Sequence, residues 1–406
     1  MKKKQTDKKQ TDKKQISKKQ ITEKQIVKKK KVRKKKEADF TLIVLTIALV
    51  IFGIIMVFSA SYYNSINEYG NPYHYLIREI FWAGLGIVLM FVISRIDYRY
   101  YKAIAWPGII VSAVLLALLF TPLGITRNYA TRWLGIGGFT LMPAEIAKIA
   151  IIIFVAYYFS SRPKRINEMS TSLVPMFGIT ILFGGLIMLQ PNMSTAMIIF
   201  GITMSMMLFA GAKWRYFIGT IVAGGVGAFI LIFSDPEGYR LKRFTSFIDP
   251  FADPLGTGYQ VMQSLFAMGS GRVFGVGIGK SIQKNLHLPE AQNDFILAVI
   301  AEELGFIGVM ILLICYLVLI WKGYEIAINA KDPFGTLVAA GITTMLALQV
   351  ILNVLVVTSS MPPTGVTLPF ISYGGNALIL FMCSMGILLN ISKNTNKQVN
   401  GSEVLK

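Results

Sequence analysis

Carboxylates in an apolar stretch are the first candidates for chemistry in this sequence. In LPEAQNDFILAVIAEELG, residues 288–305, Asp294 precedes the apolar run and Glu302 and Glu303 lie within it. Ionisable groups at membrane depth are costly and usually have a function. At about 1.5 Å of helix rise per residue, Glu302 lies roughly 12 Å deeper than Asp294, so we expect only Asp294 at the surface. The alternative role for Asp294 is helix capping alongside Asn293, because acids favour the first turn of a helix.

A second acid lies close to a base in another apolar stretch. Glu145 and Lys148 are three residues apart, just after Pro143, and proline is typical of the first turn of a helix. This spacing puts both side chains on one helix face, where they can neutralise each other. A purely structural ion pair and a substrate-facing pair are both compatible with it.

The sequence GVGIGKS, residues 275–281, is similar to a phosphate-binding loop, but the similarity is incomplete. A Walker motif needs a glycine five positions before Gly279, where Phe274 stands, and it needs a preceding strand and access to cytosolic nucleotides. We therefore do not expect a nucleotide site. The two histidines are too isolated to suggest metal ligands, and Cys315 and Cys383 fall within apolar stretches, so neither a disulfide framework nor a metal site is indicated.

The composition predicts the kind of protein that must position these residues. Apolar residues make up 54% of the 406 residues and charged residues 15%, which indicates a polytopic membrane protein. The net charge of +20 would suggest a nucleic-acid binder, but residues 1–38 alone carry +14 of it. The basic character therefore belongs to the N-terminal tail, and no nucleic-acid partner is expected.

That tail, residues 1–38, repeats every five residues as KKQTD, KKQTD, KKQIS, KKQIT and EKQIV. It has too few apolar residues to form a core, so we expect a disordered cytoplasmic arm. A polybasic arm is attracted to anionic lipid by about 1 kcal/mol per basic residue near the surface. Because no small-residue cleavage site follows the first apolar run, that run is expected to stay as a membrane anchor.

The expected fold class is an all-α polytopic membrane protein with about ten transmembrane helices between residues 39 and 392. A bilayer is crossed by about 17 to 25 apolar residues. Only LQPNM separates the fifth and sixth apolar stretches, so a kinked pair is the alternative there. The ten predicted spans are 40–59, 75–94, 103–120, 143–159, 173–189, 194–210, 217–233, 294–321, 334–357 and 370–389.

The distribution of basic residues predicts the topology. If the Lys-rich tail is cytoplasmic, the loops that carry most Lys and Arg between the spans fall on the same side, as the positive-inside rule requires. Both termini are then cytoplasmic, including a short tail at 393–406. Segments 123–142, 234–293 and 358–369 lie outside. The loop at 234–293, between the seventh and eighth spans, is long enough to be functional.

Basic residues nevertheless accumulate in these outer segments, against the rule. They suggest an anionic ligand, and a pyrophosphate at the membrane surface would suit them. The alternative is that single side chains extend to lipid headgroups. The outer cations are Arg127, Arg132, Arg240, Lys242, Arg243, Arg272, Lys280 and Lys284.

Four motifs, in order along the chain, resemble the SEDS proteins (shape, elongation, division and sporulation) of bacterial cell-wall synthesis. They are TRWLGIGGFTLMPAEIAKIA, LQPNMSTAM, GYQVMQSLFAMGSGRVFGVGIGKSIQKNLHLPEAQNDFILAVIAEELG and PPTGVTLPFISYGG. The resemblance covers residues 39 to 392. The GIGKSIQK wording before LPEAQNDF looks more similar to the division and sporulation members than to the elongation members, and we take the division members as closest.

The resemblance implies a ten-span peptidoglycan glycosyltransferase that polymerises lipid II at the outer face of the bacterial cytoplasmic membrane. It also implies partners, namely a class B penicillin-binding transpeptidase and other divisome proteins. By motif, Asp294 matches the essential acid of the family. The candidate substrate-binding residues are Arg132, Trp133, Glu145, Lys148, Arg240, Arg243 and Glu290. Ala144, Asn192 and Asn376 depart from the family pattern, and Asn192 removes a carboxylate that many members have.

This chemistry is compatible with a single carboxylate. Glycosidases generally use two, because a leaving alkoxide must be protonated, whereas a polyprenyl pyrophosphate leaves readily and needs cations instead. Asp294 would act as general base on the acceptor hydroxyl, and Arg132, Arg240 or Arg243 would stabilise the pyrophosphate. A divalent cation, Mg²⁺ or Mn²⁺, could share that role.

Two other classes of function compete with a polymerase. A lipid II flippase would explain the charged residues at depth, but alternating access needs a site near the midplane, and the richest segments lie on one side. A non-catalytic scaffold for a transpeptidase would leave Asp294 and the outer arginines without a role.

Overall fold

The computed structural model describes residues 38–127, 130–136, 139–233, 247–252, 256, 258–285 and 287–395. The chain divides into two units, Met1–Ala38 and Asp39–Lys406. Nearly all of the predicted N-terminal arm, residues 396–406 and the first part of the outer loop at 234–293 lie outside the described residues.

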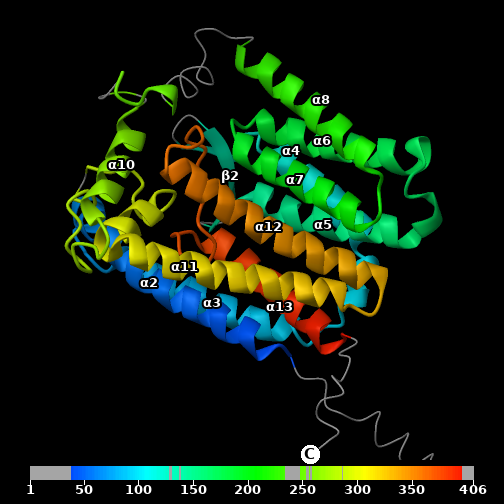
Figure 1. Ribbon diagram of the computed structural model, residues 1–406, viewed down its shortest axis with the longest axis horizontal. Helices are drawn as coiled ribbons and strands as arrows, with labels where there is room; N and C mark the ends of the chain where they lie inside the picture. The colour runs from blue at the N-terminus through cyan, green and yellow to red at the C-terminus, as the bar shows by residue number, and fades with distance from the viewer. Residues whose placement is uncertain are drawn as a thin grey trace, which may run out of the picture. The chain divides into compact units, whose positions relative to one another are not determined.

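Each of the ten predicted spans coincides with a helix, and Figure 1 shows them as one bundle. Six described helices, α2, α3, α5, α11, α12 and α13, are long and apolar enough to cross a membrane, and α4, α6 and α7 are shorter apolar helices. The ten helices are α2 (Phe40–Tyr69), α3 (His74–Ile93), α4 (Ala105–Leu118), α5 (Pro143–Ser161), α6 (Val174–Met188), α7 (Met193–Phe209), α8 (Trp214–Phe233), α11 (Ile296–Ile328), α12 (Pro333–Val357) and α13 (Gly375–Lys393). The fold class is therefore confirmed, and α6 and α7 are two separate helices.

Helices α5 and α12 form the centre of the bundle. Helix α12 packs against α5, α7 and α11, and α13 packs against α3. Both central helices carry mostly apolar side chains and are largely buried, together with a few polar residues, namely Glu145, Lys148, Gln349 and Asn353. Gly341 of α12 allows a close approach, because a Cβ there would lie 2.8 Å from both Ile152 of α5 and Met206 of α7.

The loops that carry the predicted inside charges meet at one end of the bundle. Asn390, near the end of α13, accepts a hydrogen bond from Tyr98 N at 2.9 Å and donates one to Ser94 O at 3.0 Å. Tyr98 begins the short helix η1 (Tyr98–Lys102) and donates its hydroxyl to Asp332, the residue before α12. The other short turns at this side of the chain are η2 (Pro163–Arg165) and η3 (Met169–Leu173).

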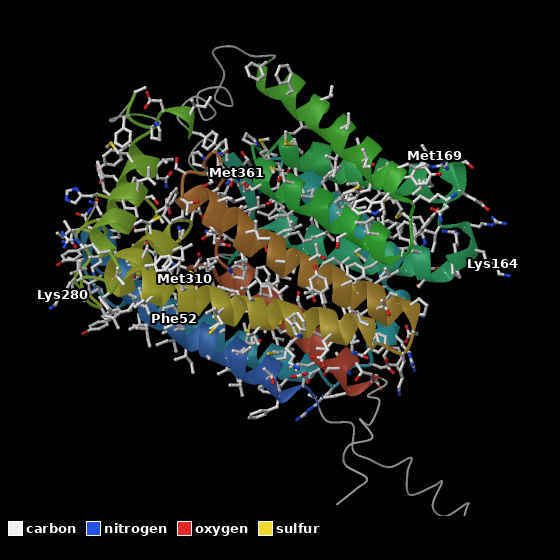
Figure 2. The ribbon with its side chains drawn as sticks, viewed as in Figure 1. Phe52, Lys164, Met169, Lys280, Met310 and Met361 are labelled. Carbon is white, nitrogen blue, oxygen red and sulfur yellow. The ribbon has the colours of Figure 1, made fainter. Side chains whose placement is uncertain are left out.

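The predicted outer segments lie at the opposite end. Figure 2 places Lys164, in a predicted inside loop, and Lys280, in the long outer loop, at opposite ends of the bundle. Asn376 donates a hydrogen bond to Thr140 O at 2.9 Å, which ties the start of α13 to the outer segment at 123–142. The outer loop also contains the helix α10 (Tyr259–Gly271).

A small antiparallel sheet, absent from the sequence-based expectation, occupies the outer segment at 123–142. Its strands are β1 (Gly124–Arg127), β2 (Ala130–Ile136) and β3 (Phe139–Leu141), paired in the order β1-β2-β3. Ile125 lies opposite Trp133, and the hydroxyls of Thr126 and Thr131 are 2.7 Å apart across the strands. β-Branched and aromatic residues favour such strands, and this sheet fixes Arg132 and Trp133 on a rigid element.

Candidate active site

Asp294 lies in a turn that ends immediately before α11. The helix begins at Ile296, and its N-cap residue is Phe295, which directly follows Asp294. The backbone carbonyl of Asp294 accepts a hydrogen bond of 2.8 Å from Nδ2 of Asn353 on α12. The turn is therefore held by a neighbouring helix, and the Asp294 side chain is half-buried.

The side chains of Asp294 and Arg132 meet at Gly365. A Cβ on Gly365 would lie 3.2 Å from Oδ2 of Asp294 and 3.4 Å from Nη1 of Arg132. Gly365 has φ +76°, a backbone conformation that side-chain-bearing residues rarely adopt. Arg132 also donates to the carbonyl of Pro191, between α6 and α7. Four segments far apart in the sequence thus converge on one carboxylate and one guanidinium.

Residues 364–367, which include Gly365, are held from two helices. Ser194 of α7 donates to Thr364 O at 2.5 Å, and Asn353 of α12 donates to Val366 O at 2.7 Å. Gln349, one turn before Asn353, donates to Thr367 O at 3.4 Å. The sequence analysis missed these three residues. The available signal was a pair of amides four residues apart in an apolar span, at 349 and 353.

Glu145 and Lys148 lie on one face of α5, as their spacing predicted. Lys148 Nζ lies 2.8 Å from Oε1 of Glu145 and donates to Oε1 of Gln349 at 3.0 Å. The side chain of Lys148 is 2% exposed and that of Glu145 7%. The pair is therefore buried, and through Gln349 it is linked to the segment that contacts Asp294.

Glu302 and Glu303 fasten the outer loop to α11. Glu303 forms an ion pair of 2.8 Å with Lys284 and accepts a hydrogen bond of 2.7 Å from Ser59. Glu302 accepts hydrogen bonds from Ser281 Oγ at 2.5 Å and Ile282 N at 2.9 Å. Lys284 is 2% exposed, so its inclusion among the outer cations available to an anionic ligand was wrong.

The backbone of the GVGIGKS segment forms hydrogen bonds with α11. Helix α11 is broken at Gly305, with φ +69° and ψ −169°, which frees carbonyl groups in the preceding turn. Val276 N donates to Glu302 O at 2.9 Å, and Gly277 N donates to Glu303 O at 3.0 Å. A phosphate-binding loop turns such N–H groups toward the anion, so this segment does not have the geometry of a nucleotide site.

Four residues remain of those predicted to bind substrate, and two of them lie among the described residues. Glu290 is half-buried in the turn before Asp294 and accepts a hydrogen bond from Asn293, and Trp133 is half-buried in β2. Arg240 and Arg243 lie outside the described residues. Within the described ranges there is no group of three or more His, Cys, Asp or Glu side chains that could hold a metal ion.

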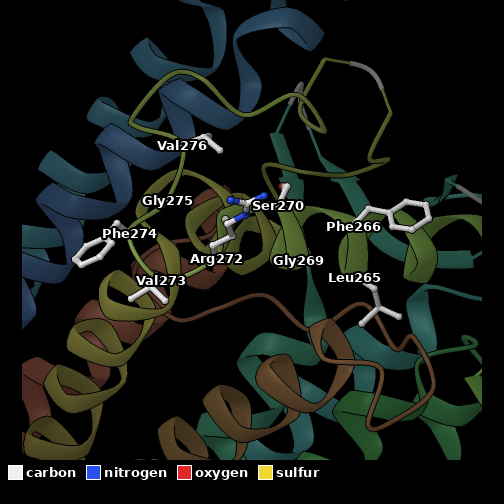
Figure 3. Close-up of a pocket in the computed structure, with 10 residues that line it drawn as sticks. Leu265, Phe266, Gly269, Ser270, Arg272, Val273, Phe274, Gly275 and Val276 are labelled. Carbon is white, nitrogen blue, oxygen red and sulfur yellow. The ribbon is translucent and has the colours of Figure 1, made fainter.

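A separate cavity of about 920 Å³ lies beside the end of α10. It is lined by residues 265–266 and 269–276, among them Phe266, Arg272 and Phe274 (Figure 3). Neither Asp294 nor Arg132 lines it. The cavity is therefore distinct from the place where the carboxylate and the guanidinium meet.

This chain is similar to known proteins over most of its length. A family model described as "Cell cycle protein", named for FtsW, RodA and SpoVE, matches residues 40–397. Stage V sporulation protein E of Bacillus subtilis (strain 168) is 40% identical over 356 residues, which cover 87% of this chain and 97% of that protein. A "Probable peptidoglycan glycosyltransferase FtsW" of Trichlorobacter lovleyi is 38% identical over 358 residues, which cover 88% of this chain and 93% of that protein.

Solved structures have the same architecture. A chain of a structure described as "Structural coordination of polymerization and crosslinking by a peptidoglycan synthase complex" matches with a TM-score of 0.74 and 26% identity, over 89% of this chain and 99% of that chain. The crystal structure of the rod shape determining protein RodA of Thermus thermophilus matches with a TM-score of 0.65 and 26% identity, over 89% and 98% of the two chains. The fold of this chain is therefore a known one, shared with these solved structures over most of its length.

Proposed function

The chain belongs to the FtsW, RodA and SpoVE family of cell cycle proteins, and from this membership we propose that it is a peptidoglycan glycosyltransferase. The membership confirms the resemblance to the SEDS family. The FtsW relatives, which are 36–38% identical to this chain, are named as probable peptidoglycan glycosyltransferases, and this supports the proposed activity. We place the reaction at the outer end of the bundle, where Asp294 and Arg132 meet.

The single observation that carries the proposal is the contact of both side chains with Gly365, with Oδ2 of Asp294 at 3.2 Å and Nη1 of Arg132 at 3.4 Å from the Cβ position there. A base and a cation that are close together suit a glycosyl transfer with an anionic leaving group. A carboxylate is ionised at neutral pH and can accept a proton.

In the proposed reaction, lipid II is both donor and acceptor. Asp294 takes the proton of the acceptor sugar's 4-hydroxyl as that oxygen attacks the anomeric carbon of the donor. The bond from that carbon to undecaprenyl pyrophosphate breaks, and the configuration inverts. Arg132 stabilises the pyrophosphate, together with Arg240 or Arg243 of the outer loop. Trp133, which follows Arg132, and Glu290, which lies four residues before Asp294, are proposed to contact the sugars.

The buried pair of Glu145 and Lys148 is proposed to stabilise the backbone next to this site. A buried ion pair is a poor source of net stability but a strong constraint on geometry, because removing one partner leaves an uncompensated charge. Lys148 donates to Gln349 at 3.0 Å, and Gln349 donates to Thr367 at 3.4 Å. The pair thus acts on the segment around Gly365, whether or not it also touches substrate.

We propose the bacterial cytoplasmic membrane as the location, with both termini cytoplasmic and the Asp294 end outside. A class B penicillin-binding transpeptidase is the proposed partner, together with other divisome proteins. Support comes from the structure of a "peptidoglycan synthase complex", to which this chain is similar over 89% of its length. The FtsW relatives favour a role in division, and the similarity to stage V sporulation protein E keeps sporulation as the alternative.

The flippase alternative loses its main support. Glu302 and Glu303 suggested a transport path at depth, but they bind Ser281, Lys284 and backbone groups of the outer loop. Buried charges with complete local partners serve to hold the loop in place. Of the four charged residues that suggested a path at depth, Glu145 and Lys148 then remain.

The test is to purify the protein with its cognate transpeptidase, supply lipid II, and look for glycan ladders. The same preparation, reconstituted in sealed liposomes, is assayed for lipid II translocation. Polymer from the unmodified protein and none from Asp294→Asn supports the proposal. Translocation without polymer would establish the flippase instead.

A further inference from the structure

Asn353 connects the two segments that face each other in the proposed site. It lies on α12 and is 0% exposed. Its Nδ2 donates to Asp294 O at 2.8 Å and to Val366 O at 2.7 Å. One amide nitrogen therefore holds the turn that carries Asp294 and the segment that carries Gly365.

We propose that Asn353 is a positioning residue that sets the distance between the Asp294 carboxylate and the segment at 364–367. This proposal deepens the proposed function and rests on it, since the distance matters because Asp294 acts as the base. Asn353 does not itself touch the reacting atoms. It acts through the backbone of two segments that are 72 residues apart in the sequence, at Asp294 and Val366.

The chemistry of the two neighbours fixes the orientation of this amide. Both are backbone carbonyls, which only accept hydrogen bonds, so the NH₂ group must face them. The two N–H bonds of one planar NH₂ group diverge at a fixed angle. The two carbonyls can satisfy both donors only at one separation, and a residue with a single donor cannot impose that separation.

The position of Val366 makes this separation matter for catalysis. Gly365, the preceding residue, lies against Oδ2 of Asp294 and Nη1 of Arg132. Ser194 and Gln349 hold the flanking residues Thr364 and Thr367, but neither bonds to the Asp294 turn. Among the described hydrogen bonds, only those of Asn353 join the two segments directly through one side chain.

A matched control is present at the other end of the bundle. Asn390 of α13 is also buried and also bridges two backbone groups, Tyr98 N at 2.9 Å and Ser94 O at 3.0 Å. Loss of the Asn353 amide leaves two carbonyls without these donors, whereas loss of the Asn390 amide leaves Tyr98 N without its acceptor and Ser94 O with the hydrogen bond of 2.9 Å from Lys393. Only the loss at Asn353 affects the segments around Asp294.

The experiment compares Asn353→Leu, Asn353→Asp and Asn390→Leu in the complex with the transpeptidase, per folded molecule. Asn353→Leu is expected to lower the kcat of lipid II polymerisation about 100-fold with little change in KM, because a displacement near 1 Å costs that much. Asn390→Leu is expected to lose thermal stability and to keep kcat. Asn353→Asp, with at most one donor when protonated, is expected to keep part of kcat and to lose it as pH rises.

Hydrogen exchange provides a readout that needs no activity. Backbone amides around residues 295–298 and 364–367 should exchange faster in Asn353→Leu than in Asn390→Leu. Equal kcat per folded molecule in Asn353→Leu and Asn390→Leu would overturn the proposal, as would unchanged exchange at both segments. If the unmodified protein makes no polymer but exchange changes as expected, the positioning contact stands and the proposed function fails.

Discussion

The ammonium group of Lys284 lies 2.8 Å from Oε1 of Glu303, and both side chains are buried. This contact joins a lysine of the long outer loop to a carboxylate inside α11, two residues before the helix break at Gly305. Ser281 of GVGIGKS and the nearby Lys284 are thus used to attach the loop to the bundle. The loop leads directly into the turn that carries Asp294.

We predict that Lys284→Met destabilises the protein by about 3–5 kcal/mol, because Glu303 is left as a buried charge without its cation. The double variant Lys284→Met/Glu303→Gln should recover much of that loss. Thermal unfolding in detergent measures both. Lys280→Met, at an exposed position of the same loop, should change stability by less than about 0.5 kcal/mol. Equal losses at Lys284 and Lys280 would contradict the buried ion pair.

The ion pair of Glu145 and Lys148 in α5 allows a second comparison of single and double variants. Lys148→Met leaves Glu145 charged and removes the donor to Gln349, so we expect a loss of several kcal/mol. The double variant Glu145→Gln/Lys148→Met should fold better than either single variant. Its polymerisation and translocation are measured on the same preparation. If the unmodified protein translocates lipid II without making polymer, and the double variant folds but no longer translocates it, the pair is a transport gate.

Asp294→Asn should keep the fold and partner binding and lose polymerisation. The Asn353 contact involves the backbone carbonyl of residue 294, which the substitution leaves in place. The amide keeps the shape of the side chain but cannot accept the proton. Glycan ladders and co-purification of the transpeptidase are the measurements. Full-length glycan from this variant would show that Asp294 is not the base.

Gly365→Ala should impair catalysis more than stability. Its Cβ would lie 3.2 Å from Oδ2 of Asp294, at a φ of +76°. Gly70 is the control, since it has φ +66° and nothing within 4 Å of its Cβ position. Both alanine variants should lose about 1–2 kcal/mol from the left-handed backbone, but only Gly365→Ala should lower kcat, by roughly tenfold. Similar kcat values for the two variants would mean that Gly365 is only a backbone requirement.

At the other end of the bundle, Asp332 should make stability depend on pH. Burial alone would raise the pKa of its carboxyl, but hydrogen bonds from Tyr98, Gly335 N and Arg99, with the charge of Lys102, hold that pKa below its usual value. Burial, followed by the hydrogen bond with Asp332, raises the pKa of Tyr98 to about 12. A lowered carboxyl pKa gives stability above the unfolded-state pKa that is lost as pH falls through the folded-state pKa.

Asp332→Asn should therefore be less stable than the unmodified protein at neutral pH, and the difference should shrink below about pH 4. Unfolding temperatures across this range provide the measurement. Asp97→Asn, at the half-buried N-cap of η1, is the comparison. A difference that stays constant with pH would exclude the titration of Asp332 as its cause.

The sequence by itself determined the elements of this protein and the residue types of its site. Spans could be predicted because an apolar run of sufficient length must become a helix in a bilayer, whatever its neighbours are. The shared face of Glu145 and Lys148 followed from helical period, and the place of Asp294 just before a helix followed from its position before an apolar run. These are local properties of the chain.

Only the tertiary structure decided which of these residues meet. Asp294, Arg132 and Gly365 converge, and Lys284 pairs with Glu303 and Ser59, because helices distant in sequence pack side by side. Spacing along the chain carries no information about such contacts. The same holds for the sheet at β1–β3, whose short strands are stabilised by pairing with each other, and for Asn353, whose importance depends on two backbone carbonyls from separate segments.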